Sequence, residues 1–571
     1  MRFRALQRVG SAVTAAVLIA GACSAAPQEP LSANEPEASS VPTVQAAVAP
    51  TNAPSAQPTA MATPTATSPT VVSTPVPLRA AAPSATPTPD PEAVREAQVA
   101  LAVEVSSLTE TACPGEPLAT VRCSIAQLPM YVEDPAHPAQ IEMLVASIDN
   151  VAEGDADPTD DVGPVLYLQG GPGVGTVSTA SRFVGLPYDV VVFDQRGTGA
   201  SVPNLGCAEV DALWVDERTA DPLRQLSDGE VLAAYDECAV RLRAEGVDFD
   251  AFNTAAVAFD TEVLRRLLDE DPWTLLGVSY GTRVAQAIMR DYPSGVRAAV
   301  LDSVVPFEID FFAEVPQNAV RAFRALAAAC DAQSCGSNHG DFFDSVVRLA
   351  AEFDAAPREV LATRPVSGEQ FLFRVDGQRF VDMVFTQMYS TRQLTALPRQ
   401  VARIDSGGLD ELVYSYVQRR DPERVDLAIG LYYSTWCREE FPFHDADAAD
   451  AFLSGLPVDL ADPLSRSLGS DAIESLCASF DVQAAPPSED LPLASDIATL
   501  VFAGAFDPIT PPQWSQQVAD RLENATYVEM PNHGHGMATA CPIQMRSAFI
   551  ISPSDDLDVS CALEVGGPAF E

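Results

Sequence analysis

The sequence predicts an α/β protein, built on a mostly parallel sheet with a helical cap inserted between two of its strands. Short apolar runs rich in Val and Leu are typical of strands buried on both faces. Amphipathic helical patterns lie between these runs, as with Phe259, Val263 and Leu267 on one helix face. The five runs are Pro164–Gly171, Tyr188–Gly197, Trp273–Ser279, Val296–Val304 and Ala498–Asp507.

The cap is predicted from the one long stretch that breaks this alternation. From about residue 307 to 491 the chain is Ala-rich and helical in period, and it shows no buried-strand pattern. We therefore expect the first part of the core over residues 92–306, the cap over 307–491, and the second part of the core, with a C-terminal segment, over 492–571.

The N-terminus has the pattern of an export signal over residues 1–22. Three Arg residues precede an apolar stretch, Ala12 to Ala20, that is too short to span a bilayer. The sequence LIAGAC, ending at Cys23, resembles the lipobox of bacterial lipoproteins, in which the Cys carries a lipid. We expect an exported protein, anchored by Cys23 to the outer face of the bacterial cell membrane.

Cleavage after Ala22 by the ordinary A-x-A rule would instead give a freely secreted protein. Residues 23–91 are dominated by Ala, Pro, Thr and Ser and contain few large apolar side chains. Such a segment cannot build a core, and we expect a disordered stalk. A membrane partner is expected only through the lipid.

Charge and cysteine content bound the class of protein. The 571 residues include 34 basic and 79 acidic ones, with no Lys, and the formal charge of -45 argues against nucleic acid as a partner. Setting Cys23 aside leaves ten of the eleven Cys, an even number suited to disulfides in an oxidising compartment. About a thousand pairings are possible. We favour neighbours along the chain: Cys113 with Cys123, Cys207 with Cys238, Cys330 with Cys335, Cys437 with Cys477, and Cys541 with Cys561.

Ser279 is the candidate nucleophile. It lies in Gly277-Val278-Ser279-Tyr280-Gly281, between a predicted strand and a predicted amphipathic helix. A sharp strand-to-helix turn strains the backbone of the serine, leaves room only for glycine on either side, and exposes the hydroxyl. The alternative is a plain turn serine.

A serine nucleophile needs a base and a group that orients the base. Of five His, His533 and His535 lie in a Gly-rich loop near the C-terminus, where the last loop of a parallel sheet would deliver a base. We favour His535. For the acid, Asp507 ends one predicted strand and Asp302 ends another, and we favour Asp507. The order Ser, Asp, His is the one used by hydrolases with this type of sheet.

The reaction also needs backbone N–H groups that bind the oxyanion. The glycines of LQGGPG follow a predicted strand, and they would let the backbone approach a substrate. Gly171 and the N–H of Tyr280 are the candidates. A simple Gly-Pro turn is the alternative, and turn and pocket need not exclude one another.

Five motifs together resemble the tripeptidyl aminopeptidase and prolyl iminopeptidase group of α/β-hydrolases. The likeness covers the chain from roughly Cys123 to Cys561, and the motifs are GGPG (170–173), DQRGTGAS (194–201), GVSYGT (277–282), FDPITPP (506–512) and GHG (534–536). The resemblance implies an α/β-hydrolase fold with a helical cap over the substrate, and cleavage at peptide N-termini by Ser279, Asp507 and His535.

The resemblance also implies that Glu439 and Glu440, in STWCREEFPF of the cap, supply carboxylates near the site. An exopeptidase must recognise a cationic α-amine, and a partly buried carboxylate does so by a charge-assisted hydrogen bond. Surface charges beside Cys437 are the alternative. The sequence departs from iminopeptidases at Gln169, where His is usual, and at Val174, where a small residue is common.

The expected activity is that of an exported serine aminopeptidase acting on short peptides, which needs no cofactor. An esterase of the same fold would use the same three residues. A non-catalytic peptide-binding lipoprotein is a third possibility, although it would not need an intact Ser, Asp and His set. A zinc enzyme using His533 and His535 would need a further ligand, and none stands out, so no metal site is predicted.

Overall fold

The computed structural model describes residues 90–115, 120–150, 162–219, 228–335, 340–421, 427–468, 473–553 and 556–570. The predicted signal peptide, Cys23 and the predicted stalk up to residue 89 lie outside the described residues, while Pro91, the last residue of the predicted stalk, begins helix α2 (Pro91–Val105). The described residues from Pro91 onward belong to one compact unit.

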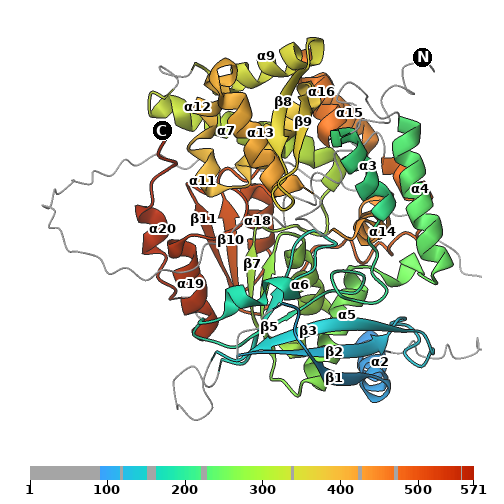
Figure 1. Cartoon of the computed structure of the whole chain (residues 1–571). Coiled ribbons are helices and arrows are strands. Elements are labelled where there is room, and N and C mark those ends of the chain that lie inside the picture. Colours follow the sequence, from blue (N-terminus) through green and yellow to red (C-terminus); the bar gives the residue numbers. More distant parts are fainter. Residues whose placement is uncertain are drawn as a thin grey trace, which may run out of the picture. The chain divides into compact units, whose positions relative to one another are not determined.

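A nine-stranded sheet runs through the centre of this unit, in the order β1-β2-β3-β5-β4-β6-β7-β10-β11 (Figure 1). The first three strands pair antiparallel, and β3 is also antiparallel to β5. From β5 to β11 every neighbouring pair is parallel. The strands are β1 (Ser107–Thr111), β2 (Val121–Pro129), β3 (Gln140–Ile148), β4 (Val165–Leu168), β5 (Val190–Phe193), β6 (Trp273–Val278), β7 (Val296–Asp302), β10 (Thr499–Gly504) and β11 (Ala525–Met530).

The parallel strands β4, β5, β6, β7 and β10 are buried on both faces, as their continuous apolar runs predict. The edge strand β11 is only partly buried. Successive residues belong to different core clusters: Leu275 and Leu301 pack on one face, Leu276 and Val300 on the other. Helices cover both faces: α2 (Pro91–Val105), α5 (Thr254–Leu267), α6 (Tyr280–Asp291), α18 (Pro512–Ala519), α19 (Ala540–Ile551) and α20 (Ser560–Glu564). Each parallel strand therefore ends in a loop at one common edge of a rigid core.

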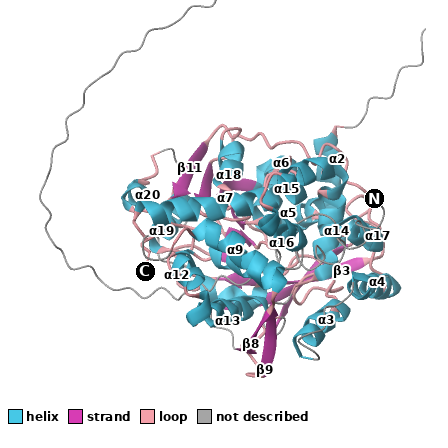
Figure 2. Cartoon of the chain, turned by 90° about the horizontal axis from the view of Figure 1, so that it is seen from above, coloured by secondary structure: helices cyan, strands magenta, loops and turns pink. Residues whose placement is uncertain are grey.

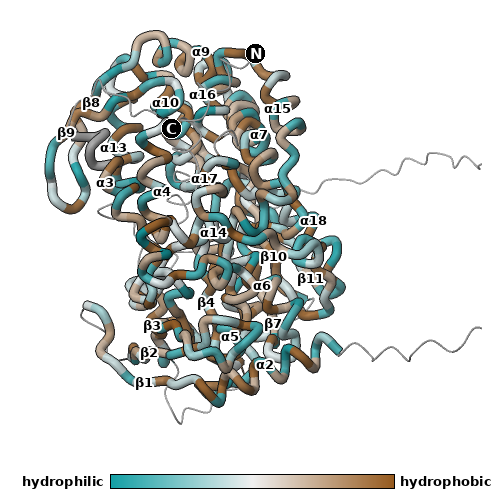
Figure 3. Tube along the Cα trace, turned by 90° about the vertical axis from the view of Figure 1, so that its right-hand side faces the viewer, coloured by the Kyte–Doolittle hydropathy of each residue, from teal (hydrophilic) through white to brown (hydrophobic). Residues whose placement is uncertain are grey.

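A helical layer lies between β7 and β10 in the chain, and it forms the upper part of the molecule in Figure 1. Its helices alternate hydrophobic and hydrophilic residues, as Figure 3 shows along the trace. They are α7 (Phe311–Ala332), α9 (Phe342–Ala355), α10 (Gly377–Met388), α11 (Thr391–Leu394), α12 (Leu397–Ala402), α13 (Gly408–Arg420), α14 (Ile429–Glu439), α15 (Ala446–Ser454), α16 (Val458–Leu468) and α17 (Ile473–Phe480). We call this layer the cap.

The expectation of a cap without strands is wrong in one place. An antiparallel hairpin, β8 (Arg358–Thr363) and β9 (Gln370–Val375), lies at the lower edge of the molecule in Figure 2. Its buried and exposed residues alternate, so that Val360 and Phe373 face inward while Leu361 and Leu372 face outward. A strand buried on one face lacks the continuous apolar run by which the core strands were predicted.

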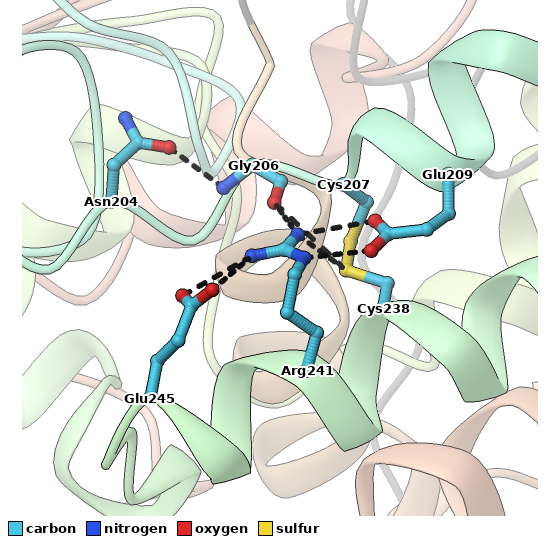
Figure 4. Close-up of a disulfide and its surroundings, with 7 residues drawn as sticks. All are labelled: Asn204, Gly206, Cys207, Glu209, Cys238, Arg241 and Glu245. Carbon is cyan, nitrogen blue, oxygen red and sulfur yellow. Dashed lines mark hydrogen bonds and ion pairs between the residues drawn. A yellow bond between two sulfur atoms is a disulfide. The ribbon is translucent and has the colours of Figure 1, made fainter.

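Five disulfides stabilise the fold, and each joins neighbours along the chain. The bonds are Cys113–Cys123, Cys207–Cys238, Cys330–Cys335, Cys437–Cys477 and Cys541–Cys561. Figure 4 shows the second, which ties the start of α3 (Ala208–Thr219) to α4 (Asp228–Ala244), where the Arg241 guanidinium pairs with Glu209 and Glu245. Five disulfides are typical of a protein that works outside the cytoplasm.

Candidate active site

Four loops meet at the carboxyl edge of the parallel strands, and they carry the residues singled out from the sequence. Gly171 follows β4, Ser279 follows β6, Asp507 follows β10 and His535 follows β11. Because β4, β6, β7, β10 and β11 are successive neighbours, these loops share one rim of the sheet.

Ser279 occupies the strained turn between β6 and α6. Its φ is 57° and its ψ is -126°, a backbone conformation that residues with a side chain rarely adopt. Its N–H donates to the Asp302 carbonyl at 2.9 Å. A Cβ on Gly281 would lie 2.0 Å from the Leu168 carbonyl oxygen, so the helix can approach β4 only with glycine there. The local sequence thus places a serine at the rim.

Asp507 and His535 form a close pair. One carboxylate oxygen of Asp507 lies 2.8 Å from Nδ1 of His535, and it also accepts a hydrogen bond from the Thr510 hydroxyl at 2.7 Å. The other oxygen accepts the backbone N–H groups of Ile509 and Thr510 at 3.0 and 2.9 Å. Burial alone would raise the pKa of Asp507, but His535 and these donors hold it below its usual value.

Asp302 is the alternative candidate for the acid, and its hydrogen-bond partners differ from those of Asp507. Its carboxylate accepts the Met537 N–H at 2.9 Å and the Ser303 hydroxyl at 3.1 Å, and that hydroxyl in turn accepts the Gly536 N–H at 2.9 Å. Burial raises the pKa of Asp302, partly offset by the Met537 hydrogen bond. Asp302 therefore holds the backbone of the loop that carries His535.

His533 has its own partners on both ring nitrogens. Nδ1 lies 2.6 Å from the Asn532 amide oxygen, and Nε2 lies 2.7 Å from the Thr539 hydroxyl. A neutral ring that donates from Nδ1 and accepts at Nε2 satisfies both contacts. Burial lowers the pKa of His533 to about 4. These contacts serve the loop rather than the serine.

The glycine loop after β4 lies directly beside the nucleophile. A Cβ on Gly170 would lie 2.9 Å from the Cβ of Ser279. The next residue, Gly171, has a φ of +128°, which favours glycine. Tyr280 is the first residue of α6, where a backbone N–H has no partner within its own helix. Both candidate donors thus belong to elements that flank Ser279.

The two positions where the sequence departs from iminopeptidases have defined contacts. The side-chain oxygen of Gln169 accepts the Tyr167 hydroxyl at 2.6 Å, and its carbonyl accepts the Gln195 amide at 3.3 Å. Val174 forms a β-bridge with Leu427 of the cap. The first departure helps fix the strand end before the glycines, and the second joins the glycine loop to the cap.

Glu439 and Glu440 are buried and not surface charges, since their exposed fractions are 4% and 3%. Glu439 accepts the N–H and the hydroxyl of Thr254, both at 2.7 Å, and lies 3.3 Å from Nε of Arg283. Glu440 lies 2.6 Å from Nη1 of Arg283 and accepts the Phe311 N–H at 3.2 Å. Burial raises the pKa of Glu440 to about 8, against the opposing effect of Arg283. Recognition of a substrate amine by these residues stays a prediction, because groups of the protein already engage both.

The sequence reasoning missed three residues of the site: Thr510, Arg283 and Tyr389. The Tyr389 carbonyl accepts the His535 N–H at 3.1 Å, and the two rings lie 4.9 Å apart between centroids. Thr510 lies in the quoted FDPITPP motif, three residues after Asp507, which is a detectable signal. Arg283 follows Ser279 by one helical turn, but only the fold reveals its partners.

Within the described parts of the chain, no group of three or more His, Cys, Asp or Glu side chains is arranged to hold a metal ion. Over the same residues, no helix is long and apolar enough to cross a membrane.

Two stretches of the chain match known protein families. Residues 163–343 match the family described as alpha/beta hydrolase fold, and residues 464–561 match the one described as TAP-like protein. The first covers the glycine loop and Ser279, and the second covers Asp507 and His535.

Individual relatives match over about a quarter to a third of the chain. The serine protease Hip1 of Mycobacterium tuberculosis is 32% identical over 159 residues, which are 26% of this chain and 30% of that protein. The tripeptidyl aminopeptidase of Streptomyces coelicolor is 30% identical over 200 residues, 32% of this chain and 35% of that protein. The chain thus spans about a third of the length of these curated relatives. Among solved structures, proline iminopeptidase from Mycobacterium smegmatis is 16% identical with a TM-score of 0.31, covering 75% of this chain and 96% of that one.

Proposed function

Because the chain is a TAP-like α/β hydrolase, we propose that it is an exported serine hydrolase that removes residues or short peptides from free peptide N-termini. The pairing of Asp507 with His535 at 2.8 Å, on the same sheet edge as Ser279, is the observation that carries the proposal. The relatives named serine protease and tripeptidyl aminopeptidase support peptides as the substrate class.

In the proposed mechanism, the Ser279 hydroxyl attacks the carbonyl carbon of the bond to be cut. His535 accepts the hydroxyl proton as the new C–O bond forms, and Asp507 stabilises the resulting imidazolium through Nδ1. The carbonyl oxygen becomes an oxyanion, which the N–H groups of Gly171 and Tyr280 bind.

Collapse of this intermediate breaks the C–N bond, and His535 gives its proton to the leaving amine. The N-terminal part of the substrate then remains on Ser279 as an ester. Water attacks that ester with His535 as the base, which releases the acid product and restores the serine.

The finer part of the proposal is a preference for substrates with a free N-terminus. In it, the cationic amine of the substrate binds Glu439 and Glu440. Two carboxyl groups face one guanidinium, and since burial raises the pKa of Glu440 to about 8, the cluster gains an excess negative charge as the pH rises through that value. An esterase of the same fold is the second candidate, because Arg283 already engages both carboxylates. Attachment of a lipid at Cys23 is likewise proposed from the sequence motif alone.

The test uses the purified exported protein and three substrates: a tripeptide p-nitroanilide with a free N-terminus, its N-acetylated form, and p-nitrophenyl acetate. We expect turnover of the free peptide, little turnover of the acetylated one, and no activity in Ser279→Ala. Equal cleavage of the free and acetylated peptides would contradict the aminopeptidase assignment. Turnover of the ester alone would favour the esterase, and full activity of Ser279→Ala would exclude the serine mechanism.

A further inference from the structure

Arg283 lies at the centre of a buried charge cluster that joins the core to the cap. Its exposed fraction is 2%, and it belongs to α6, one turn after Ser279. Both of its carboxylate partners come from the C-terminal end of α14 in the cap, with Nε facing Glu439 and Nη1 facing Glu440. Nη1 also donates to the Pro306 carbonyl at 2.9 Å. One guanidinium thus forms two ion pairs with the cap and one hydrogen bond with the core.

Aromatic rings restrict the guanidinium further. Its central carbon lies 5.2 Å from the ring centre of Phe307 and 5.9 Å from that of Trp436, distances suited to cation–π contact. Trp436 also packs edge-on against Tyr280, with ring centres 5.9 Å apart. The planar fork of Arg is needed for this arrangement, since Lys would supply a single point charge.

A second chain of contacts leads from Glu439 to the residue after the nucleophile. Glu439 accepts the Thr254 hydroxyl at 2.7 Å, and the oxygen of that hydroxyl lies 2.8 Å from the Tyr280 phenol oxygen. Glu439 is therefore linked to α6 twice, through Arg283 and through Tyr280. These two residues flank the first turn of the helix that Ser279 precedes.

We propose that Glu439 and Glu440 are positioning residues, which fix the first turns of α6 through Arg283 and so place the Ser279 hydroxyl and the Tyr280 N–H for the reaction. This rests on the proposed serine-hydrolase function. It assigns the carboxylates an effect on every substrate, with or without an amine. Small misplacements of reacting groups have large effects on rate, so loss of the contacts acts on kcat.

The structure offers a matched control in Glu262 of α5. Its buried carboxylate lies between two guanidiniums, 2.8 Å from Arg265 and 2.8 Å from Arg266. The further partners of these guanidiniums are the Glu270 carbonyl and Glu96, outside the site. Glu262→Gln breaks a buried ion-pair cluster of similar size, and it reports the effect of lost stability alone. We expect it to lower the thermal midpoint and to leave kcat unchanged.

The experiment compares Glu439→Gln and Arg283→Met with the unchanged protein and with Glu262→Gln. Three rates are measured on protein shown by circular dichroism to be folded: turnover of a free tripeptide p-nitroanilide, turnover of p-nitrophenyl acetate, and inactivation by phenylmethylsulfonyl fluoride. The last two need no substrate amine. We expect all three rates to fall together, by about tenfold or more, in both site variants.

Unchanged ester turnover and unchanged sulfonylation in folded Glu439→Gln would overturn the proposal. If the KM of the free peptide then rose in Glu439→Gln and fell in Arg283→Met, the carboxylates would act only as receptors for the substrate amine and not as positioning residues. Should Arg283→Met fail to fold, Glu439→Gln and Glu440→Gln decide between these outcomes. Ser279→Ala distinguishes the failure of one proposal from that of the other. Sulfonylation or turnover that persists in Ser279→Ala contradicts the serine mechanism, and with it the positioning role. Unchanged rates in Glu439→Gln beside an inactive Ser279→Ala contradict the positioning role alone.

Discussion

At the scale of single residues, the Asp507 carboxylate illustrates how burial and charge combine at this site. A buried carboxylate without partners would become protonated, yet four contacts, from two backbone N–H groups, the Thr510 hydroxyl and His535, favour its charged form. An anion at this position keeps the proton of a neutral His535 on Nδ1, so that Nε2 carries no proton and can act as a base. The carboxylate therefore selects the tautomer that the reaction needs.

We predict that Asp507→Asn lowers kcat by about four orders of magnitude, because the amide cannot stabilise the imidazolium and favours the wrong tautomer. The measurement is steady-state turnover of p-nitrophenyl acetate. Asp302→Asn is the control, since the Asp302 carboxylate accepts the backbone N–H of Met537 in the same loop. It is expected to lower the thermal midpoint with a much smaller loss of kcat. Equal losses of kcat in the two variants would make Asp302 a candidate for the acid again.

A separate prediction concerns His533 and the pH dependence of the free energy of unfolding. Its pKa is about 4 in the folded chain and 6.5 when unperturbed, so between these values the unfolded chain binds a proton that the folded chain does not. The contribution of neutral His533 to the free energy of unfolding is intact above pH 6.5 and declines as the pH falls to about 4. The loss amounts to about 3 kcal/mol.

His533→Gln keeps a polar side chain but does not titrate. Urea unfolding of the two proteins between pH 4 and 7.5 should therefore show the free energy of unfolding falling more steeply toward acid in the unchanged protein. Parallel curves would mean that His533 is not held neutral by the fold.

At the scale of elements, the sequence predicted those strands whose two faces are both buried. The runs of β4, β5, β6, β7 and β10 are continuous because helices cover both sides of them. The antiparallel strands β1 and β2 were not predicted, since β1 is largely exposed and reads SLTET, and β2 contains several half-buried residues. β3 was missed although Met143–Ala146 are buried, because Glu142 and Ser147 interrupt its apolar run. The hydrophobic pattern of a strand reflects its burial, and the pattern is weak where one face of the strand is exposed to water.

The residues of the candidate site could likewise be predicted where contiguous sequence creates their geometry, and not where distant parts of the chain create it. Ser279 was predicted because the strand, turn and helix that create its geometry are contiguous in the sequence. Arg283 was not, because its partners Glu439 and Glu440 lie on a helix of the cap, and no periodicity links positions so far apart. Sequence motifs identified which groups could react, and only the fold identified what holds them in place.

The disulfides allow a prediction about elements. Cys437–Cys477 joins α14 to α17 and closes a loop of 40 residues, whereas Cys330–Cys335 closes a loop of 5. The loop-closure entropy of the unfolded chain predicts a loss of about 4 kcal/mol for the paired Cys→Ala variant of the first and about 2 kcal/mol for the second. Urea unfolding of both double variants measures the difference. A larger loss for the shorter loop would show that native contacts, and not chain entropy, dominate.

At the scale of the whole molecule, the cap contacts every element of the candidate site. Arg321 and Asn318 of α7 donate to carbonyls of the loop that carries Asp507, at Ala505, Asp507 and Ile509. The Ala428 N–H donates to the Gly173 carbonyl of the glycine loop at 2.8 Å. Together with the Arg283 cluster and the Tyr389 carbonyl, these contacts make the cap part of the framework that orients the core loops.

The tightest of these approaches is at Gly534, beside His535, and it gives the last prediction. A Cβ on Gly534 would lie 2.1 Å from the Met388 carbonyl oxygen at the end of α10, and backbone atoms cannot turn away as a side chain can. Gly534→Ala should therefore shift the His535 loop away from the cap, and a displacement of about 1 Å predicts a loss of about 100-fold in kcat. Gly229→Ala, on α4 with no atom within 4 Å of the new Cβ, is the control and should keep full activity. The measurement is turnover of p-nitrophenyl acetate at a temperature where both variants are folded. Full activity of Gly534→Ala would mean that the cap and the base loop separate freely, and that the cap acts as a lid and not as a support.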